Sequence, residues 1–268
     1  MFIDTHAHTN DVFFKDDLGR VVSLAIDKNV KKIICVSTSL HDSELSLKAS
    51  REYPENIFPA VGLYPHRDET DRGGSDEELI EKLEGIIKDN KDKIVAIGEC
   101  GLDLGELAEN ETARSVHDQK NLFLAQIELA LKYDLPIIIH CRKAYDELLE
   151  ILNSNQKFKN LRGSIHFYTG GKKRIRNLLE FPGFVFGVAG PITYDDGLQQ
   201  VAREIPLDKI VLETDSPLLV PLPFRGQRGE PAHIPLIAAK VAEIKGIDIN
   251  EVERATEENT ERVFDLKK

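Results

Sequence analysis

The stretch LPIIIHCRKAYDELLEILNSN, residues 135–155, contains a unit that the rest of the chain repeats. It begins with a short apolar run ending in His140, which is typical of a buried strand. From residue 146 onward, apolar residues return at three- and four-residue intervals, which is typical of an amphipathic helix. A chain that alternates such segments is predicted to form βαβ units around a parallel sheet.

The same alternation extends in both directions over the 268 residues. NLFLAQIELALKY at 121–133 is predicted to be an outer helix, and a further helix at 250–265 follows Gly246, a stop signal for the helix before it. Eight units fit one (β/α)8 TIM barrel, although periodicity alone also allows an open, doubly wound sheet. No flexible linker divides the chain, so we predict a single α/β barrel domain over residues 1–268. The predicted strands are residues 2–5, 32–36, 58–62, 94–98, 136–140, 163–167, 184–188 and 209–213.

Composition excludes several classes of protein. With 41% hydrophobic and 30% charged residues, the chain has no apolar run near the roughly 18 residues of a membrane span, and no membrane partner is expected. The formal net charge of −11 disfavours broad, non-specific binding to nucleic acid. The opening MFIDTHAH lacks the features of a secretory signal, so a cytoplasmic location is expected. Cys35, Cys100 and Cys141 are predicted to be reduced core residues, because their number is odd and no CxxC spacing occurs.

Polar residues that can bind metal follow the predicted strands at their carboxyl ends, where barrel enzymes keep their active sites. Two histidines of DTHAH are two residues apart, so in an extended strand both side chains face the same side. Each histidine alone is more often structural, but their joint occurrence at strand ends, with an acid after the eighth strand, favours a metal site. These residues are His6, His8, His140, His166 and Asp215.

Glu99 lies in VAIGECG, at the end of the predicted fourth strand, and is expected to bridge two metal ions through its carboxylate. The alternative is an ordinary loop acid in a salt bridge. Gly98 and Gly101 on either side predict a tightly constrained turn, which favours the functional interpretation.

Six segments, DTHAH, GLYPH, GECGLD, PIIIHCR, HFYTG and LETDSP, resemble in order and spacing the TatD family of metal-dependent deoxyribonucleases, within the amidohydrolase-like superfamily. The resemblance runs from Phe2 to about Pro231. It implies a hydrolase that cleaves phosphodiester bonds in DNA as an exonuclease, acting on single-stranded DNA or DNA ends, with no obligate protein partner inferred. It also implies two divalent metal ions, Mg, Mn or Zn, and residues with matching positions as ligands: His6, His8, Glu99, His140, His166 and Asp215.

The catalytic residues implied by the resemblance are Asp215, as a metal ligand that also accepts a proton from the attacking water, and the bridging Glu99. Metal identity stays open, because four imidazoles with two carboxylates suit Zn, Mn, Fe or Co better than an oxygen-only Mg site, whereas the family is often Mg-dependent. Glu213 and Asp4, each two residues before a proposed ligand, either orient that ligand or are buried structural acids.

Substrate contacts are expected from His66 in GLYPH, from Arg142 and from Arg225, whose guanidinium groups suit phosphate oxygens. The run KKRIR at 172–176 either steers a strand or is a solvated face. Three positions depart from the family pattern and affect this region: Leu104 and Gly105, which follow Asp103 where an aromatic residue is usual, and Gly229, where asparagine is usual.

Two alternative functions fit the same residues. A barrel hydrolase acting on a C–N or C–O bond of a small molecule would use the same metal-activated water. Many such enzymes bridge their metals with a carboxylated lysine on the fourth strand, whereas this chain has Glu99 there. A non-catalytic metal-binding scaffold would be expected to lack a ligand or the general base, and here all are present.

Overall fold

The computed structural model describes residues 1–67, 70, 74–107 and 112–266. In this part of the chain, eight strands form one sheet in sequential order, and each strand runs parallel to its neighbour. The strands are β1 (Phe2–Ala7), β2 (Val30–Cys35), β3 (Ile57–Val61), β4 (Ala96–Asp103), β5 (Ile137–Arg142), β6 (Gly163–Ile165), β7 (Phe184–Val188) and β8 (Ile210–Leu212).

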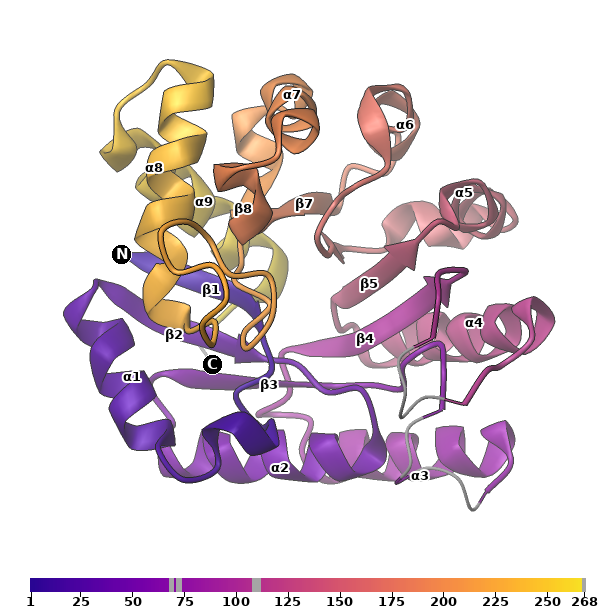
Figure 1. Ribbon diagram of the computed structural model, residues 1–268. Helices are drawn as coiled ribbons and strands as arrows, with labels where there is room; N and C mark the ends of the chain where they lie inside the picture. Colours follow the sequence, from indigo (N-terminus) through magenta and orange to yellow (C-terminus); the bar gives the residue numbers. More distant parts are fainter. Residues whose placement is uncertain (68–69, 71–73, 108–111, 267–268) are drawn as a thin grey trace.

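Helices connect consecutive strands and surround them as an outer layer (Figure 1). This arrangement confirms the predicted (β/α)8 barrel. The α-helices are α1 (Leu18–Asp27), α2 (Leu40–Glu52), α3 (Asp76–Asp89), α4 (Val116–Tyr133), α5 (Tyr145–Asn153), α6 (Gly171–Leu178), α7 (Asp196–Glu204), α8 (Ile234–Lys245) and α9 (Ile249–Phe264). Short 3-10 helices are η1 (Val12–Phe14), η3 (Gln156–Asn160), η4 (Gly190–Thr193), η5 (Leu207–Lys209) and η6 (Pro231–His233).

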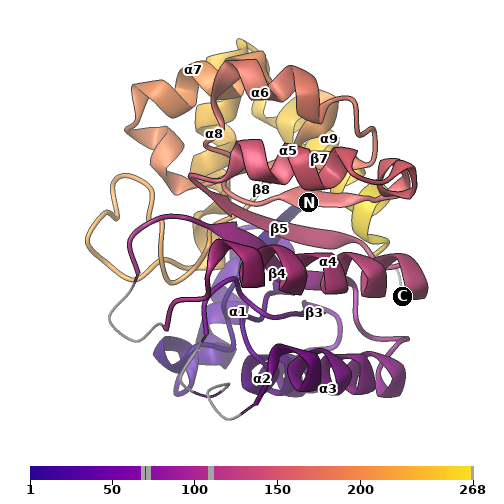
Figure 2. The same ribbon diagram turned by 90° about the vertical axis from the view of Figure 1, so that its right-hand side faces the viewer.

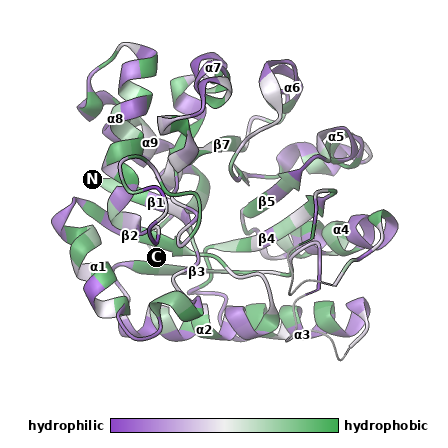
Figure 3. Ribbon diagram, in the orientation of Figure 1, coloured by the Kyte–Doolittle hydropathy of each residue, from purple (hydrophilic) through white to green (hydrophobic). Residues whose placement is uncertain are grey.

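Local sequence explains where the outer helices begin and end. Serines accept a backbone N–H at the first turn of three of them: Ser39 before α2, Ser75 before α3 and Ser115 before α4. Gly246 ends α8 in the left-handed conformation, as predicted, with φ of 67°. In Figure 3 the strands are mostly hydrophobic, while hydrophobic and hydrophilic residues alternate along the helices, as expected for helices with one face on the barrel.

The end of the barrel opposite the βα loops is closed by the C-terminal part of the chain. Val263, Phe264 and Leu266 form one buried cluster with side chains of seven strands, among them Ile3 and Ile34. In Figure 2 the loop between β8 and α8 extends to the left, whereas the C-terminus lies to the right. The side chains at and after the end of α9 therefore fill the floor, where barrel residues generally serve stability.

The junction between β8 and β1 closes the barrel without a regular ladder. A single parallel bridge joins Ala7 to Ser216, and the Asp215 N–H donates to the His6 carbonyl at 2.8 Å. The buried Asp4 carboxylate accepts hydrogen bonds from the Thr214 backbone N–H, at 3.0 Å, and from its hydroxyl. Backbone and side-chain hydrogen bonds thus hold the first strand against the last.

One local prediction was wrong. Gly98 and Gly101 do not form a turn, because β4 continues through them to Asp103. Gly101 has a φ of 145°, and a Cβ there would lie 2.0 Å from the His140 carbonyl oxygen of β5. Glycine is required because two strand backbones approach closely, rather than because the chain reverses.

Cys35, Cys100 and Cys141 are buried and unpaired, as predicted. No helix among the described residues is both long enough and apolar enough to cross a membrane.

Candidate metal centre

The structure brings together all six residues predicted as metal ligands. They extend from β1, β4 and β5 and from the segments that directly follow β1, β6 and β8, all at the carboxyl end of the barrel. Their ligand atoms form three overlapping groups, in each of which the atoms lie within 4.8 Å of one another. The groups are His6, His166 and Asp215; His6, His8 and Glu99; and Glu99, His140 and His166.

Glu99 lies between two sets of histidines. Its Oε2 is 3.4 Å from His6 Nε2 and 3.6 Å from His8 Nε2. Its other oxygen, Oε1, is 2.6 Å from His140 Nδ1 and 3.9 Å from His166 Nε2. Each carboxylate oxygen therefore faces its own pair of imidazoles, which is the arrangement expected of a bridging ligand.

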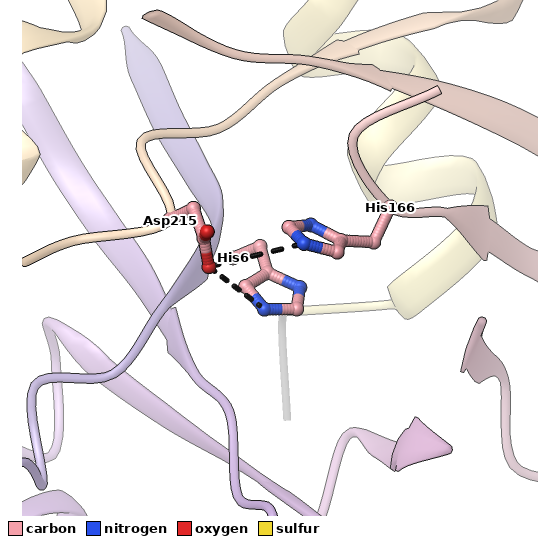
Figure 4. Close-up of side chains that lie close together, drawn as sticks. All are labelled: His6, His166 and Asp215. Atoms are coloured by element: carbon pink, nitrogen blue, oxygen red, sulfur yellow. Dashed lines mark ion pairs between the residues drawn. The ribbon is translucent and has the colours of Figure 1, made fainter. Parts of the chain in front are cut away.

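Asp215 lies next to His6 and His8, the two histidines at the end of β1. Its Oδ1 lies 3.5 Å from His6 Nε2, 3.3 Å from His8 Nε2 and 3.8 Å from His166 Nε2. The rings of His6 and His166 stack with centroids 3.6 Å apart, and Figure 4 shows Asp215 facing both of them. Asp215 has a φ of 53°, and its carbonyl accepts a hydrogen bond from the Leu218 N–H at 2.8 Å, so the backbone fixes its direction.

The spacing of these atoms fits divalent cations. Two ligands bound about 2.1 Å from a tetrahedral ion lie about 3.4 Å apart. Most nitrogen–oxygen separations in the cluster, 3.3 to 3.9 Å, are close to this value and longer than a good hydrogen bond. Imidazoles together with carboxylates suit Zn, Mn, Fe or Co, and the identity of the metal stays a prediction.

The electrostatics of the cluster favour positive charge. Burial alone would lower the pKa of His8, but its hydrogen bond to Asp215 and the charges of Asp215 and Glu99 raise it to about 9. Burial likewise opposes protonation of His166, but the charges of Glu213 and Asp215 raise its pKa to about 10. Burial would raise the pKa of Glu99, and His6 and His140 instead hold it well below its usual value. The same negative field attracts a divalent cation.

Glu213 orients His166. Its Oε1 lies 2.9 Å from His166 Nδ1 and accepts the Phe167 N–H at 2.6 Å, and the side chain is fully buried. With Nδ1 facing the Glu213 carboxylate, Nε2 of His166 points toward Glu99 and Asp215. Of the two interpretations of Glu213, the structure favours the orienting one. Asp4 instead contacts Thr214 at the barrel junction, which favours its structural role.

Asp103 and Tyr64 orient His140, and neither residue was singled out from the sequence. Asp103 Oδ2 lies 3.1 Å from His140 Nε2 and accepts a hydrogen bond from the Tyr64 hydroxyl at 2.8 Å. Burial would raise the pKa of Asp103, but its hydrogen bonds to His140 and Gly105 lower it to about 2. An ionised Asp103 favours a proton on Nε2, so Nδ1 of His140 is directed at Glu99. Asp103 belongs to the motif GECGLD and Tyr64 to the motif GLYPH, but nothing in the sequence shows that these two segments meet.

The predicted substrate contacts have different environments. His66 is buried, and its ring lies 6.2 Å from that of Tyr64, which itself contacts His140. Arg142 lies against Asp103, with Nε 3.5 Å from Oδ1, and also donates to the Glu106 carbonyl. The Arg225 guanidinium lies 4.6 Å from the centre of the Tyr194 ring. Their contact with substrate stays a prediction.

Two departures from the family pattern have a steric explanation. A Cβ at Gly105 would lie 1.9 Å from Arg142 Nε, so the small residue provides space for the guanidinium. A Cβ at Gly229 would lie 2.6 Å from the Leu218 carbonyl oxygen, so the loop after β8 is packed too closely for asparagine. Nothing in the structure explains Leu104.

The run KKRIR opens α6, and two of its cations are paired with acids. Lys172 contacts Glu204 at 3.1 Å and Arg174 contacts Asp146 at 2.8 Å. This favours a solvated face.

Comparisons with known proteins agree over nearly the whole chain. A family model described as TatD related DNase matches residues 3–265. The chain is 34% identical over 267 residues to an uncharacterized metal-dependent hydrolase, YabD, of Bacillus subtilis, covering 98% of this chain and 99% of that one. It is 30% identical over 261 residues to the 3′-5′ ssDNA/RNA exonuclease TatD of Salmonella typhimurium, covering 94% and 95%. The crystal structure of YJJV, a TatD homologue of Escherichia coli, superimposes with a TM-score of 0.87 at 28% identity, over 98% of both chains.

Proposed function

This chain belongs to the TatD related DNase family of metal-dependent hydrolases, and we propose that it is an exonuclease that shortens single-stranded DNA in the 3′ to 5′ direction. The resemblance predicted from the six motifs is thereby confirmed at the level of the family. The observation that carries the proposal is the position of Glu99, whose two oxygens face separate pairs of histidines. The direction and the single-stranded substrate are supported by the relative named as a 3′-5′ ssDNA/RNA exonuclease.

The six clustered side chains would hold two divalent ions. His6, His8, Glu99 and Asp215 would hold one of them, and Glu99, His140 and His166 the other. When bound, such ions polarise a phosphoryl oxygen and lower the pKa of a coordinated water.

The chain's own residues would orient the reactants and accept the proton. Asp215 lies at the cluster, with Oδ1 3.3 Å from His8 Nε2, and would accept the proton of the attacking water. The water oxygen bonds to phosphorus, and the ester oxygen of the remaining strand leaves. No covalent bond to the protein is needed. Glu213 and Asp103 would keep His166 and His140 in their binding orientations.

We also propose a cytoplasmic location. Its support is that all three cysteines are buried and unpaired, which suits a reducing compartment.

The proposal is tested by following the length of 5′-labelled single-stranded DNA with time, while manganese or magnesium is titrated into the purified protein. Stepwise shortening that requires metal, is lost in Asp215→Ala and persists in Asp89→Ala is the expected result. Asp89 is an exposed aspartate at the end of α3 and serves as the matched control. Absence of shortening by metal-loaded wild type, with turnover of an ester or a cyclic amide instead, would refute the nuclease and favour the small-molecule hydrolase.

A further inference from the structure

Exposed large apolar side chains gather at one end of the molecule. Among the described residues, all six lie in loops that follow the carboxyl ends of strands, or at the first residue of such a helix. Four belong to the loop between β1 and α1 and the loop between β8 and α8. These four, which we call the apolar rim, are Val12 (75% exposed), Phe13 (64%), Leu218 (59%) and Leu222 (47%).

The two loops that carry the rim are joined to each other. Arg228 donates to the Phe13 carbonyl and to the Asp17 carboxylate, the latter at 2.7 Å. Its neighbour Gly229 donates its N–H to the Pro217 carbonyl at 2.9 Å, directly before Leu218. Phe13 and Leu218 are therefore connected through a short series of direct contacts, so the two loops that carry the rim lie side by side.

The rim adjoins the metal cluster on both loops. The Asp11 N–H donates to the His8 carbonyl at 2.9 Å, one residue before Val12. The Leu218 N–H donates to the Asp215 carbonyl at 2.8 Å. On both loops, the first residue of the rim therefore lies close along the backbone to a residue of the metal cluster.

Charge does not explain what the rim would bind. Residues 9–20 and 217–230 together contain four acidic and four basic residues. Two of the basic residues, Arg20 and Arg228, are paired with Asp17 and Glu230. Non-specific binding of nucleic acid comes mainly from an excess of positive charge, and these loops carry none, so they are poorly suited to hold a long phosphate backbone by charge. Arg225 stays a predicted contact to a single phosphate.

We propose that the apolar rim binds the unpaired bases next to the phosphodiester bond being cleaved, with Phe13 as a stacking platform. This inference rests on the proposed nuclease function and deepens it. Bases have flat apolar faces that stack on aromatic side chains without sequence preference. In a duplex those faces are covered by neighbouring base pairs. The rim therefore selects single strands through their bases, while the phosphate is held at the metal cluster.

The test compares Phe13→Ala, Phe13→Leu and Phe13→Tyr on two single strands of equal length, one ordinary and one with abasic 3′-terminal nucleotides. Loss of stacking is expected to raise KM for the ordinary strand about 5- to 100-fold in Phe13→Ala, with Phe13→Leu intermediate and Phe13→Tyr close to wild type. On the abasic strand all variants should match wild type. Because the Phe13 side chain is 64% exposed, unfolding temperatures should stay equal.

Salt dependence gives a second readout. Each phosphate contact to a single strand contributes about −0.7 to the slope of log affinity against log salt, so a slope near −1 is expected and one steeper than about −3 would overturn the proposal. An equal effect of Phe13→Ala on both strands, or no effect, would also overturn it. If wild type dimerises and Phe13→Ala is monomeric in sedimentation, the rim is a contact between copies and the proposal fails. If wild type cleaves no strand, the proposed function is refuted. If wild type cleaves and Phe13→Ala has the same KM, only this inference is refuted.

Discussion

Asp103→Asn should weaken the binding of one metal ion and spare the other. The change removes a negative charge but keeps the size of the side chain, and its amide oxygen can still accept the Gly105 N–H that Asp103 Oδ1 accepts at 2.7 Å. The substitution removes the ionised Oδ2, which lies 3.1 Å from His140 Nε2 and also accepts a hydrogen bond from the Tyr64 hydroxyl. His140 then becomes a weaker and less firmly oriented ligand.

The size of this effect follows from the contact of Asp103 with one proposed metal ligand, His140. Removing an outer partner of a metal-bound histidine generally costs about 10- to 100-fold in metal affinity, or about 1.4 to 2.7 kcal/mol. His140 belongs to the group formed with Glu99 and His166, and not to the group of His6, His8 and Glu99. One of the two binding steps should therefore move by this amount while the other keeps its wild-type Kd.

Isothermal titration with manganese measures both steps, and Asp89→Asn serves as the control for removal of a charge. The unfolding temperature of metal-free Asp103→Asn should stay near that of wild type, so that a lost binding step is not a lost fold. Equal weakening of both steps would contradict the assignment of His140 to one ion. Unchanged affinity in both steps would show that Asp103 does not orient His140.

Three further predictions follow from the same contacts. Glu213→Gln should also lower the affinity of the ion held by His166 about 10- to 100-fold, because Oε1 lies 2.9 Å from His166 Nδ1; an unchanged titration would contradict this. Metal at about 100 times its Kd should raise the unfolding temperature by about 5 to 10 °C in differential scanning calorimetry; chelator should abolish this rise, and His166→Ala should reduce it by removing a ligand of one ion. Hydrogen bonds to Arg228 and Arg20 lower the pKa of Asp17 to about 2, so its ion pairs stabilise the fold above its ordinary pKa and lose this effect as pH falls toward 2. Wild type should therefore melt above Asp17→Asn at pH 7, and the gap between the two melting temperatures should shrink as pH falls toward 2; a gap that stays constant would show that the ion pairs are not its source.

The barrel could be predicted from the sequence because its strands are short, apolar and regularly spaced. The periodicity of LPIIIHCRKAYDELLEILNSN reports burial directly, and β5 and α5 lie within a few residues of the predicted bounds. The gathering of six side chains was also predictable. Parallel strands place their carboxyl ends at one end of a barrel, so residues far apart in sequence must meet there.

The sequence could not reveal which segments far apart in the chain contact each other, because such contacts produce no pattern within either segment. Tyr64, in the loop after β3, meets Asp103 at the end of β4, and only three-dimensional proximity distinguishes Asp103 from any other acid at a strand end. The glycines near Glu99 predict a turn as readily as a close approach of two strands, because both require glycine, and the structure has the second. Arg228 shows no motif, yet it connects the loops after β1 and β8.

The junction between β8 and β1 has a consequence for the timing of activity during synthesis. His6 and His8 leave the ribosome early, but Asp215 and the bridge from Ala7 to Ser216 need more than two hundred further residues to emerge. The floor needs Val263, Phe264 and Leu266 as well, which follow Asp215 still further along the chain. A nascent chain therefore has histidines without their closing carboxylate, and a truncated product lacks either the acid or the floor. A complete metal cluster therefore forms only after the segments that carry Asp215 and the floor have emerged, so a partly made copy lacks the proposed hydrolase activity.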